Sequence, residues 1–341
     1  MFIISDNKRR KTSFGCAFNS SSRACLVHNS SAHCFLSPDA EGGASAAAAA
    51  SSGDLGTTEA EASTGWRGNP PSASAGLGPS ASGATGTSSS STCPPSSIPF
   101  HGDFSGCSNN AQALFAAKAD KQENKWKKGM SLFNNHDFVI VEETHNQEGR
   151  SDVFKLPERF RAFWSNGTAS TAGVGIILQR DFLAKFDPVD EDRDWVEIEK
   201  GYAACLRLRG PSGALDIFCI YMPTGSGSTI YTKYRKNIML NISKCICPKE
   251  DVLSIMAGDW NFVEHDSDRW CFETGQYTGN KDSGEAEFFK LHLSNPHGFH
   301  EWSQDHYTCE AGASRSRIDR MYCNQNMAMQ LDRHITCSVL E

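Results

Sequence analysis

The segment at residues 255–262 limits the possible folds of this chain more than any other. Apolar residues at 255–257 lead into a glycine, and Asp259 and Asn261 follow. Apolar residues that stop at a glycine are typical of a buried strand ending in a tight turn. Alternate residues on extended backbone point the same way, so the carboxylate and the amide share one side. Two interpretations stay open: a chemical site at the carboxyl end of a strand, or an Asx-turn that closes the strand.

Three further segments of the chain deliver polar groups in the same way. The run at 137–141 leads to Glu143, the run at 215–220 leads to Tyr221, and the segment at 317–319 ends in Asp319. Acids, an amide and a phenol at the ends of strands of one sheet build an oxygen-rich site, which suits Mg²⁺ or Mn²⁺ rather than zinc. A phosphate ester is the natural substrate, because a divalent cation neutralises charge on phosphate oxygens while a carboxylate orients the attacking water.

The alternation of helical and strand patterns predicts a mixed α/β protein built in layers. Helical spacing of apolar residues occurs at 111–133, 231–246 and 283–293. Strand patterns lie between them, and those at 195–198 and 203–209 form an expected antiparallel pair across a glycine turn. Antiparallel pairs among the alternating elements argue against a purely parallel, doubly wound sheet.

Composition divides the chain into two regions. Residues 1–93 are rich in Ser, Ala and Gly and poor in bulky apolar side chains, so we predict that they are disordered. Residues 94–341 form the predicted folded domain. The first region holds six basic and six acidic residues, so the net charge of −7 falls on the second. Because proteins that clamp nucleic acid non-specifically are usually basic, any contact with nucleic acid must come from a local patch.

The sequence also bears on the compartment. It contains no apolar run of the length that spans a membrane, and its short apolar start is followed by a basic cluster at 8–11 instead of a signal-peptide core. The 13 cysteines are odd in number and scattered, which favours reduced thiols. We therefore expect a nuclear or cytoplasmic protein. The sequence does not determine an oligomeric state.

Four segments together resemble the motifs of the endonuclease/exonuclease/phosphatase superfamily. Val141-Glu142-Glu143-Thr144-His145 resembles its "QETH" motif, Ile220-Tyr221-Met222-Pro223 its "Y-x-P" motif, Gly258-Asp259-Trp260-Asn261 its "GDFN" motif, and Ser314-Arg315-Ser316-Arg317-Ile318-Asp319 its "SRIDY" motif. They occur in the family's order within residues 98–323. The second pair of motifs looks most like the apurinic-type endonuclease domain of non-LTR retrotransposons.

The resemblance implies a four-layer α/β sandwich, with two mixed β-sheets packed face to face and helices outside. It also implies roles for individual side chains. Glu143 matches the metal-binding glutamate, and Asp259 matches the aspartate that positions or deprotonates the nucleophilic water. Asn261 matches the asparagine that contacts the phosphate, and Tyr221 the tyrosine that assists the phosphate or leaving group. Asp319 would orient other groups; a structural ion pair with a neighbouring arginine is the alternative. The implied cofactor is Mg²⁺ or Mn²⁺, and the implied partner is DNA.

The chain departs from the family pattern at three places. Asp103 stands where the family has a metal-site asparagine, so we expect Asp103 to bind metal beside Glu143. Glu142 replaces the usual glutamine. The closing "SDH" motif with its histidine is absent, so we expect a sandwich truncated at its C-terminal strand, with reduced or absent turnover. Two alternatives to a DNA endonuclease therefore stay open: a lipid or inositol phosphate phosphodiesterase of the same superfamily, and a non-catalytic remnant that binds nucleic acid.

Overall fold

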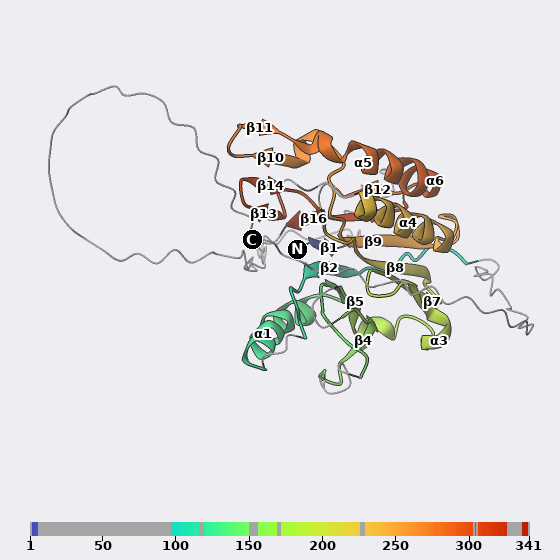
Figure 1. Cartoon of the computed structure of the whole chain (residues 1–341). Helices are drawn as coiled ribbons and strands as arrows, with labels where there is room; N and C mark the ends of the chain where they lie inside the picture. Colours follow the sequence, from blue (N-terminus) through green and yellow to red (C-terminus); the bar gives the residue numbers. More distant parts are fainter. Residues whose placement is uncertain are drawn as a thin grey trace, which may run out of the picture. The chain divides into compact units, whose positions relative to one another are not determined.

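The computed structural model describes residues 2–5, 97–115, 119–149, 156–168, 172–225, 229–302, 304, 306–325 and 336–339. All of them belong to one compact unit, made of Met1–Ser31 and Ser91–Glu341 (Figure 1). The predicted disorder of residues 1–93 falls outside the described residues, except at 2–5. There the structure differs from the prediction, because Phe2–Ser5 forms strand β1 and pairs with strands on both sides.

The first six-stranded sheet has the order β16-β1-β2-β3-β5-β4. Its strands are β1 (Phe2–Ser5), β2 (Ser105–Asn110), β3 (Phe138–Glu142), β4 (Phe160–Ser165), β5 (Val174–Gln179) and β16 (Thr336–Val339). The pair β2 and β3 is parallel, and the other pairs are antiparallel. The sheet is therefore mixed, as predicted.

The second six-stranded sheet has the order β12-β15-β9-β8-β7-β6. Its strands are β6 (Trp195–Glu199), β7 (Ala203–Gly210), β8 (Gly213–Tyr221), β9 (Leu253–Asp259), β12 (His300–Glu301) and β15 (Asp319–Cys323). Only β8 and β9 are parallel. A separate four-stranded sheet, β11-β10-β14-β13, consists of β10 (Arg269–Cys271), β11 (Gln276–Tyr277), β13 (Cys309–Ala311) and β14 (Ser314–Ser316).

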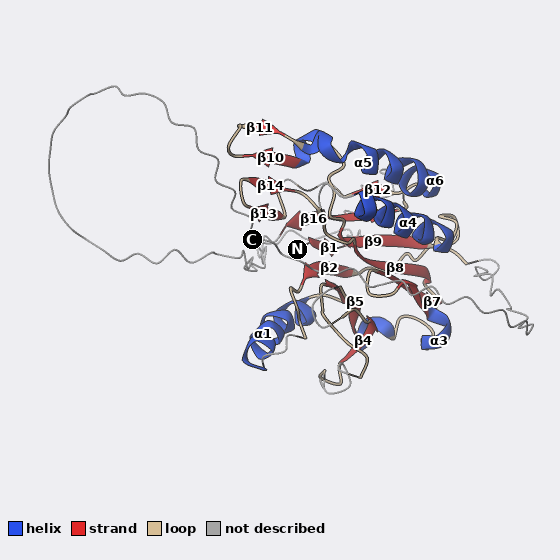
Figure 2. Ribbon diagram, viewed as in Figure 1, coloured by secondary structure: helices blue, strands red, loops and turns tan. Residues whose placement is uncertain are grey.

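Helices cover the outer faces of the two large sheets (Figure 2). The helices of the described residues are α1 (Ala119–Asn135), α2 (Arg180–Leu183), α3 (Glu191–Asp194), α4 (Thr229–Cys245), α5 (Ser283–Phe289) and α6 (Asn295–His297), with short helical turns at Asp266–Asp268, Gly279–Asp282 and Lys290–Ser294. Side chains of α1 pack with the outer face of the first sheet, and side chains of α4 and α5 with that of the second. This arrangement gives the four layers that the motif resemblance implied.

The predicted start of the first helix is wrong. Residues 111–115 continue beside the end of β3 instead, with the amides of Ala111 and Ala113 donating to the carbonyls of Glu142 and Glu143. Gln112 and Ala113 have positive φ, which is incompatible with a right-handed helix. Helix α1 therefore begins only at Ala119.

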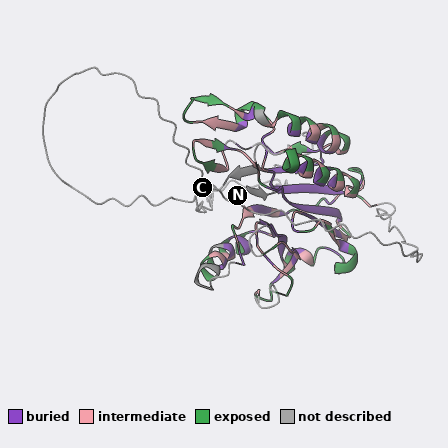
Figure 3. Cartoon of the chain, in the orientation of Figure 1, coloured by how far each residue is buried: buried purple, intermediate pink, exposed green. Residues whose placement is uncertain are grey.

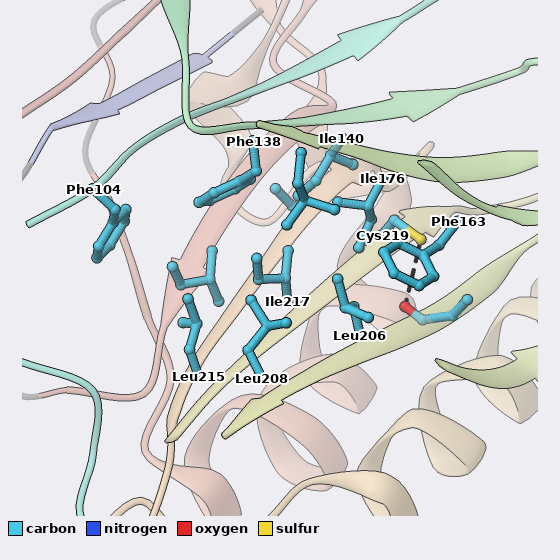
Figure 4. Close-up of a cluster of buried hydrophobic side chains, with 14 of the residues drawn as sticks. Phe104, Phe138, Ile140, Phe163, Ile176, Leu206, Leu208, Leu215, Ile217 and Cys219 are labelled. Atoms are coloured by element: carbon cyan, nitrogen blue, oxygen red, sulfur yellow. Dashed lines mark hydrogen bonds between the residues drawn. The ribbon is translucent and has the colours of Figure 1, made fainter. Parts of the chain in front are cut away.

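The main core lies between the two large sheets (Figure 4). Figure 3 shows the central strands of both sheets as buried along their length. Because side chains alternate along a strand, one set from each strand enters this core and the other set packs under the helices. In β9, for example, Leu253, Ile255 and Ala257 belong to the inter-sheet core, whereas Met256 packs on the helix side. This alternation decides which polar residues end up inside at the strand ends.

Two further expectations concern the oxidation state of the cysteines and membrane-spanning segments. Seven described cysteines are free, but Cys247 is disulfide-bonded, so the expectation that all the thiols are reduced is wrong at that position. Among the described residues, no helix is long and apolar enough to cross a membrane.

Candidate active site

The inter-sheet core is closed at one end by carboxylates. On β9 the alternation that buries Ile255 and Ala257 places Asp259 on the same face, and Asp259 is only 4% exposed. Its partner in the neighbouring strand β15 is Asp319, which shares its face with Met321 of the core. The second sheet therefore contributes two paired acids to the end of the core.

The first sheet contributes an acid from the opposite side. Phe138 and Ile140 of β3 enter the inter-sheet core, so the next residue of the same parity, Glu142, does so too, and it is 1% exposed. The hydroxyl of Ser108 on β2 donates a hydrogen bond to Glu142 Oε1. Asn110, two residues further along β2, extends its Nδ2 to 3.5 Å from Asp259 Oδ2. The two sheets thus meet through polar side chains at this end.

Glu143 joins the same cluster by a turn of the backbone. Strand alternation alone would direct it to the helix side with Val141, but its φ of 50° lies in the left-handed region. Its Oε1 accepts a hydrogen bond of 2.5 Å from the hydroxyl of Tyr221, at the end of β8. The ring of Tyr221 is stacked on Tyr202, with 6.1 Å between centroids and 6° between planes. Tyr221 and Glu143 are therefore held against each other from different sheets.

The proximity of these acids changes their protonation. Burial, and then repulsion from Asp319, raises the pKa of Asp259 well above its ordinary value; Glu142 and Glu143 add to that repulsion. The pKa of Asp319 is raised by burial and by Glu143. Burial raises the pKa of Glu142 to about 8, although the bond from Ser108 opposes the change. A cation bound among these groups would stabilise their ionised forms and oppose the rise in their pKa values.

The turn after β9 reconciles the two interpretations of residues 255–262. The amide of Asn261 donates to Asp259 Oδ1 at 2.9 Å, which is an Asx-turn. The side-chain Nδ2 of Asn261 donates to the carbonyl of Met222 at 2.7 Å, just beyond β8. The Asx-turn and the acidic site therefore coexist, because the second oxygen of Asp259 faces Asn110.

Backbone strain is concentrated around the same end of the sheets. Among the described residues, every non-glycine position with positive φ lies in the loops that surround the cluster: Gln112, Ala113, Glu143, His145, Ala172 and Asn261. These loops are bonded to one another, since Ala113 donates to Glu143 O at 2.6 Å and His145 to Ala172 O at 3.0 Å. Such conformations cost free energy and are typical of functional sites, where the surrounding structure holds them.

The structure does not bring Asp103 beside Glu143, where the metal site was expected. Asp103 is exposed and precedes β2, and its carbonyl accepts a hydrogen bond from Lys185. Because β2 runs parallel to β3, its far end, at Asn110, is the end that lies beside Glu142. Asn110, which the sequence analysis missed, therefore lies beside Glu142 and Asp259, where Asp103 was expected. The sequence did contain a signal for Asn110, because the segment Ser105–Asn110 ends in polar side chains as the other strands do.

The alternative role of Asp319, an ion pair with a neighbouring arginine, is not what the structure shows. Arg317 and Arg320 instead bond Asp268, at 2.6 Å and 2.8 Å. Arg320 is fully buried and also reaches Glu264 at 3.2 Å. This network ties the loop after β9 to the start of β15. Asp268 is therefore a buried structural anion.

The cluster fits a hard divalent cation. No group of three or more His, Cys, Asp or Glu side chains in the described ranges is arranged as a metal site. Mg²⁺, however, needs only one or two protein carboxylates, because it keeps several waters and takes substrate phosphate oxygens. The carboxylate of Glu143 and the amide oxygen of Asn110 are donors of the right kind, and the neighbouring acids supply the negative charge.

Comparisons with known proteins were made for the whole chain. No protein-family model and no curated protein matches it. Solved structures do match. The AP endonuclease LMAP from Leishmania major is 13% identical, with 66% of this chain and 79% of that chain covered and a TM-score of 0.46. The endonuclease domain of TRAS1, a telomere-specific non-LTR retrotransposon, is 15% identical, with 65% and 85% covered and a TM-score of 0.39. The 3'-5' exonuclease NExo from Neisseria meningitidis is 16% identical, with 64% and 85% covered and a TM-score of 0.44. At these identities and TM-scores the matches describe a likeness of fold alone.

Proposed function

We propose that this chain is a metal-dependent phosphodiester hydrolase, and specifically a DNA endonuclease of the retroelement type. The observation that carries the proposal is the convergence of four acids, Glu142, Glu143, Asp259 and Asp319, with Tyr221 at one end of the inter-sheet core. Buried like charges are costly, and a fold keeps them together where they bind a cation or a reacting group. Strained loops at the same place support a role in function over one in stability.

The residues divide the chemistry among themselves. Glu143 and Asn110 would hold Mg²⁺ or Mn²⁺, which supplies charge neutralisation at the phosphate oxygens. In its ionised form, which a bound cation would favour, Asp259 would accept a proton from the attacking water and fix its position. The hydroxyl of Tyr221 donates a hydrogen bond to Glu143 in the free protein. The same hydroxyl could donate instead to a phosphate oxygen or a leaving oxygen. Asp319, opposite Asp259 in the strand pair, orients the acid beside it.

Nicking of DNA tests this proposal. Supercoiled plasmid and an oligonucleotide with an abasic site are incubated with the full chain in Mg²⁺ or in EDTA. We expect nicking that requires Mg²⁺ and that falls at least about 100-fold in Asp259→Asn, which removes the proton acceptor at constant size. Asp266→Asn is the matched control, because Asp266 is an exposed acid in the loop that follows.

Other outcomes decide between the alternatives. A folded protein that cleaves phospholipid head groups in Mg²⁺ but leaves DNA intact belongs to the lipid phosphodiesterase branch. A folded protein that binds Mg²⁺ and cleaves neither substrate is a non-catalytic remnant. Either result overturns the endonuclease proposal. Mg²⁺-dependent nicking would also show that turnover does not need the closing histidine motif.

A further inference from the structure

The four-stranded sheet carries an aromatic surface that the acid cluster does not use. Strand pairing places Trp270 opposite both Tyr277 and Arg315, so the three side chains share one face. Phe272, in the turn just after β10, lies against the same face, since its ring centroid is 5.7 Å from the guanidinium of Arg315. The rings of Trp270 and Tyr277 are in edge contact, with centroids 5.1 Å apart. We call this set, with Tyr307, the aromatic–arginine face.

The rings of this face are unusually open to solvent for this protein. Phe272 is 47% exposed and Tyr277 is 55% exposed, and both residues of β11 are exposed. Phe272 lies in the turn that joins β10 to β11, and Tyr277 lies at the end of β11. These two strands lie side by side in Figure 1. Exposed apolar residues are ordinary when they are scattered, but rings gathered on one face of a small sheet indicate a binding surface.

Arg315 gives the face a positive charge. Its guanidinium lies 4.5 Å from the ring centroid of Tyr307 and 5.7 Å from that of Phe272. Arg315 forms no ion pair with any residue in the part of the chain that the structure describes. A guanidinium held between rings keeps its planar donors for a phosphate and can also stack on a base.

The hairpin of β13 and β14, which carries Arg315, also contacts the strand that contains Asp319. Thr308 Oγ1 accepts the backbone amide hydrogens of Ile318 and Asp319, at 3.1 Å and 3.0 Å. Cys309, the next residue, has its pKa raised to about 11 by burial and by repulsion from Asp319 and Asp259. The hairpin that carries Arg315 is therefore bonded to the start of the strand that carries Asp319.

We propose that the aromatic–arginine face binds unpaired nucleobases of the DNA, which stack on Phe272 and Tyr277 while Arg315 contacts the backbone. The inference deepens the proposed function and rests on it, because it makes DNA with a single-stranded stretch beside the cleaved bond the preferred substrate. Stacking platforms with an arginine are a general way to hold unpaired bases without reading their sequence. The guanidinium of Arg315 beside the rings offers donors for a backbone phosphate next to surfaces for stacking, which is the combination that single-stranded nucleic acid uses.

Binding is measured without catalysis, so that the inference and the proposed function fail separately. The full chain in EDTA is titrated into a fluorescent single-stranded oligonucleotide and into the duplex of the same sequence, by anisotropy. The test variant is Phe272→Ala/Tyr277→Ala. Its control is Leu291→Ala, since Leu291 is 66% exposed but lies outside this sheet. Hydrolysis of bis(4-nitrophenyl) phosphate, a diester without bases, reports on the acid cluster alone.

We expect the double variant to bind the single strand at least about tenfold more weakly, with duplex binding and diester hydrolysis unchanged. Arg315→Ala should weaken single-strand binding as well and reduce its salt dependence by about one counterion. Equal single-strand affinity for the parent and the double variant would overturn the inference, as would an equal loss in Leu291→Ala. Loss of binding to anionic vesicles in the double variant, with oligonucleotide binding intact, would also overturn it. Weaker oligonucleotide binding in a protein that hydrolyses no diester would support the face while refuting the proposed activity.

Discussion

The pH dependence of stability gives a quantitative test of the acid cluster through Glu142. The pKa of this carboxyl group rises from 4.5, its ordinary value, to about 8 in the folded protein, chiefly because it is buried. The folded state therefore binds the proton more tightly than the unfolded state. By linkage, the free energy of unfolding falls as pH rises between these two pKa values, by roughly 3 kcal/mol at pH 7 and roughly 5 kcal/mol above pH 8.

The substitution Glu142→Gln removes this term. An amide has the same shape as the protonated carboxyl group, and its oxygen can still accept the bond from Ser108. We expect the variant to match the parent near pH 4 and to be more stable at pH 7, by roughly 3 kcal/mol. The other acids of the cluster add pH dependence to both proteins, so the difference between the two is the quantity to compare.

Urea unfolding followed by circular dichroism, in EDTA and at a series of pH values from 4 to 9, measures that difference. Glu287→Gln is the control, because Glu287 is exposed on α5 and should leave the pH profile unchanged. Parallel profiles for the parent and Glu142→Gln would refute the reasoning that Glu142 is a buried acid forced to keep its proton. Added Mg²⁺ should flatten the parent's profile if the cluster binds it, since the cation favours the ionised carboxylates.

Three other changes test separate parts of the structure. Tyr221→Phe removes the hydroxyl that donates to Glu143. We expect nicking to fall about 10- to 100-fold, because one hydrogen bond to the transition state is lost, while the melting temperature stays unchanged. Gly258→Ala should prevent folding, as judged by circular dichroism, because φ is 144° and the added carbon would collide with the backbone of β8. Arg320→Met leaves Asp268 without one of its buried partners, so urea unfolding should show a loss of about 3–5 kcal/mol; a change below 1 kcal/mol would contradict the network.

The ion pairs of Arg317 and Arg320 with Asp268 explain why the motif around Arg317 contains so many charged residues. Only Asp319 of that motif turns toward the inter-sheet core, while Arg317 and Arg320 hold the loop that follows Asp259. The arginines act on the site through the backbone that they fix. A substitution there should therefore lower stability and activity together, unlike Asp259→Asn, which should lower activity without lowering stability.

The sequence by itself determined which strands end in polar groups and which face Asp259 takes. The apolar run at 255–257 predicted a strand that delivers Asp259 and Asn261 to one side, and the corresponding runs before Glu143 and Tyr221 predicted polar groups at their ends. Local patterns of this kind are reliable because the period of two is a property of the extended backbone itself. The mixed α/β class followed from the same patterns, since elements alternate with antiparallel pairs among them.

The tertiary structure alone decided which strand ends meet. Asn110 reaches Asp259 because β2 is parallel to β3 and faces the second sheet, and neither relation is written in the residues of β2. For the same reason Asp103 lies at the wrong end of the strand, although it fits the motif better in sequence. Glu142 enters the cluster because its parity directs it into the core between the sheets. Register and sheet packing depend on contacts between residues far apart in the chain, so no local pattern can specify them.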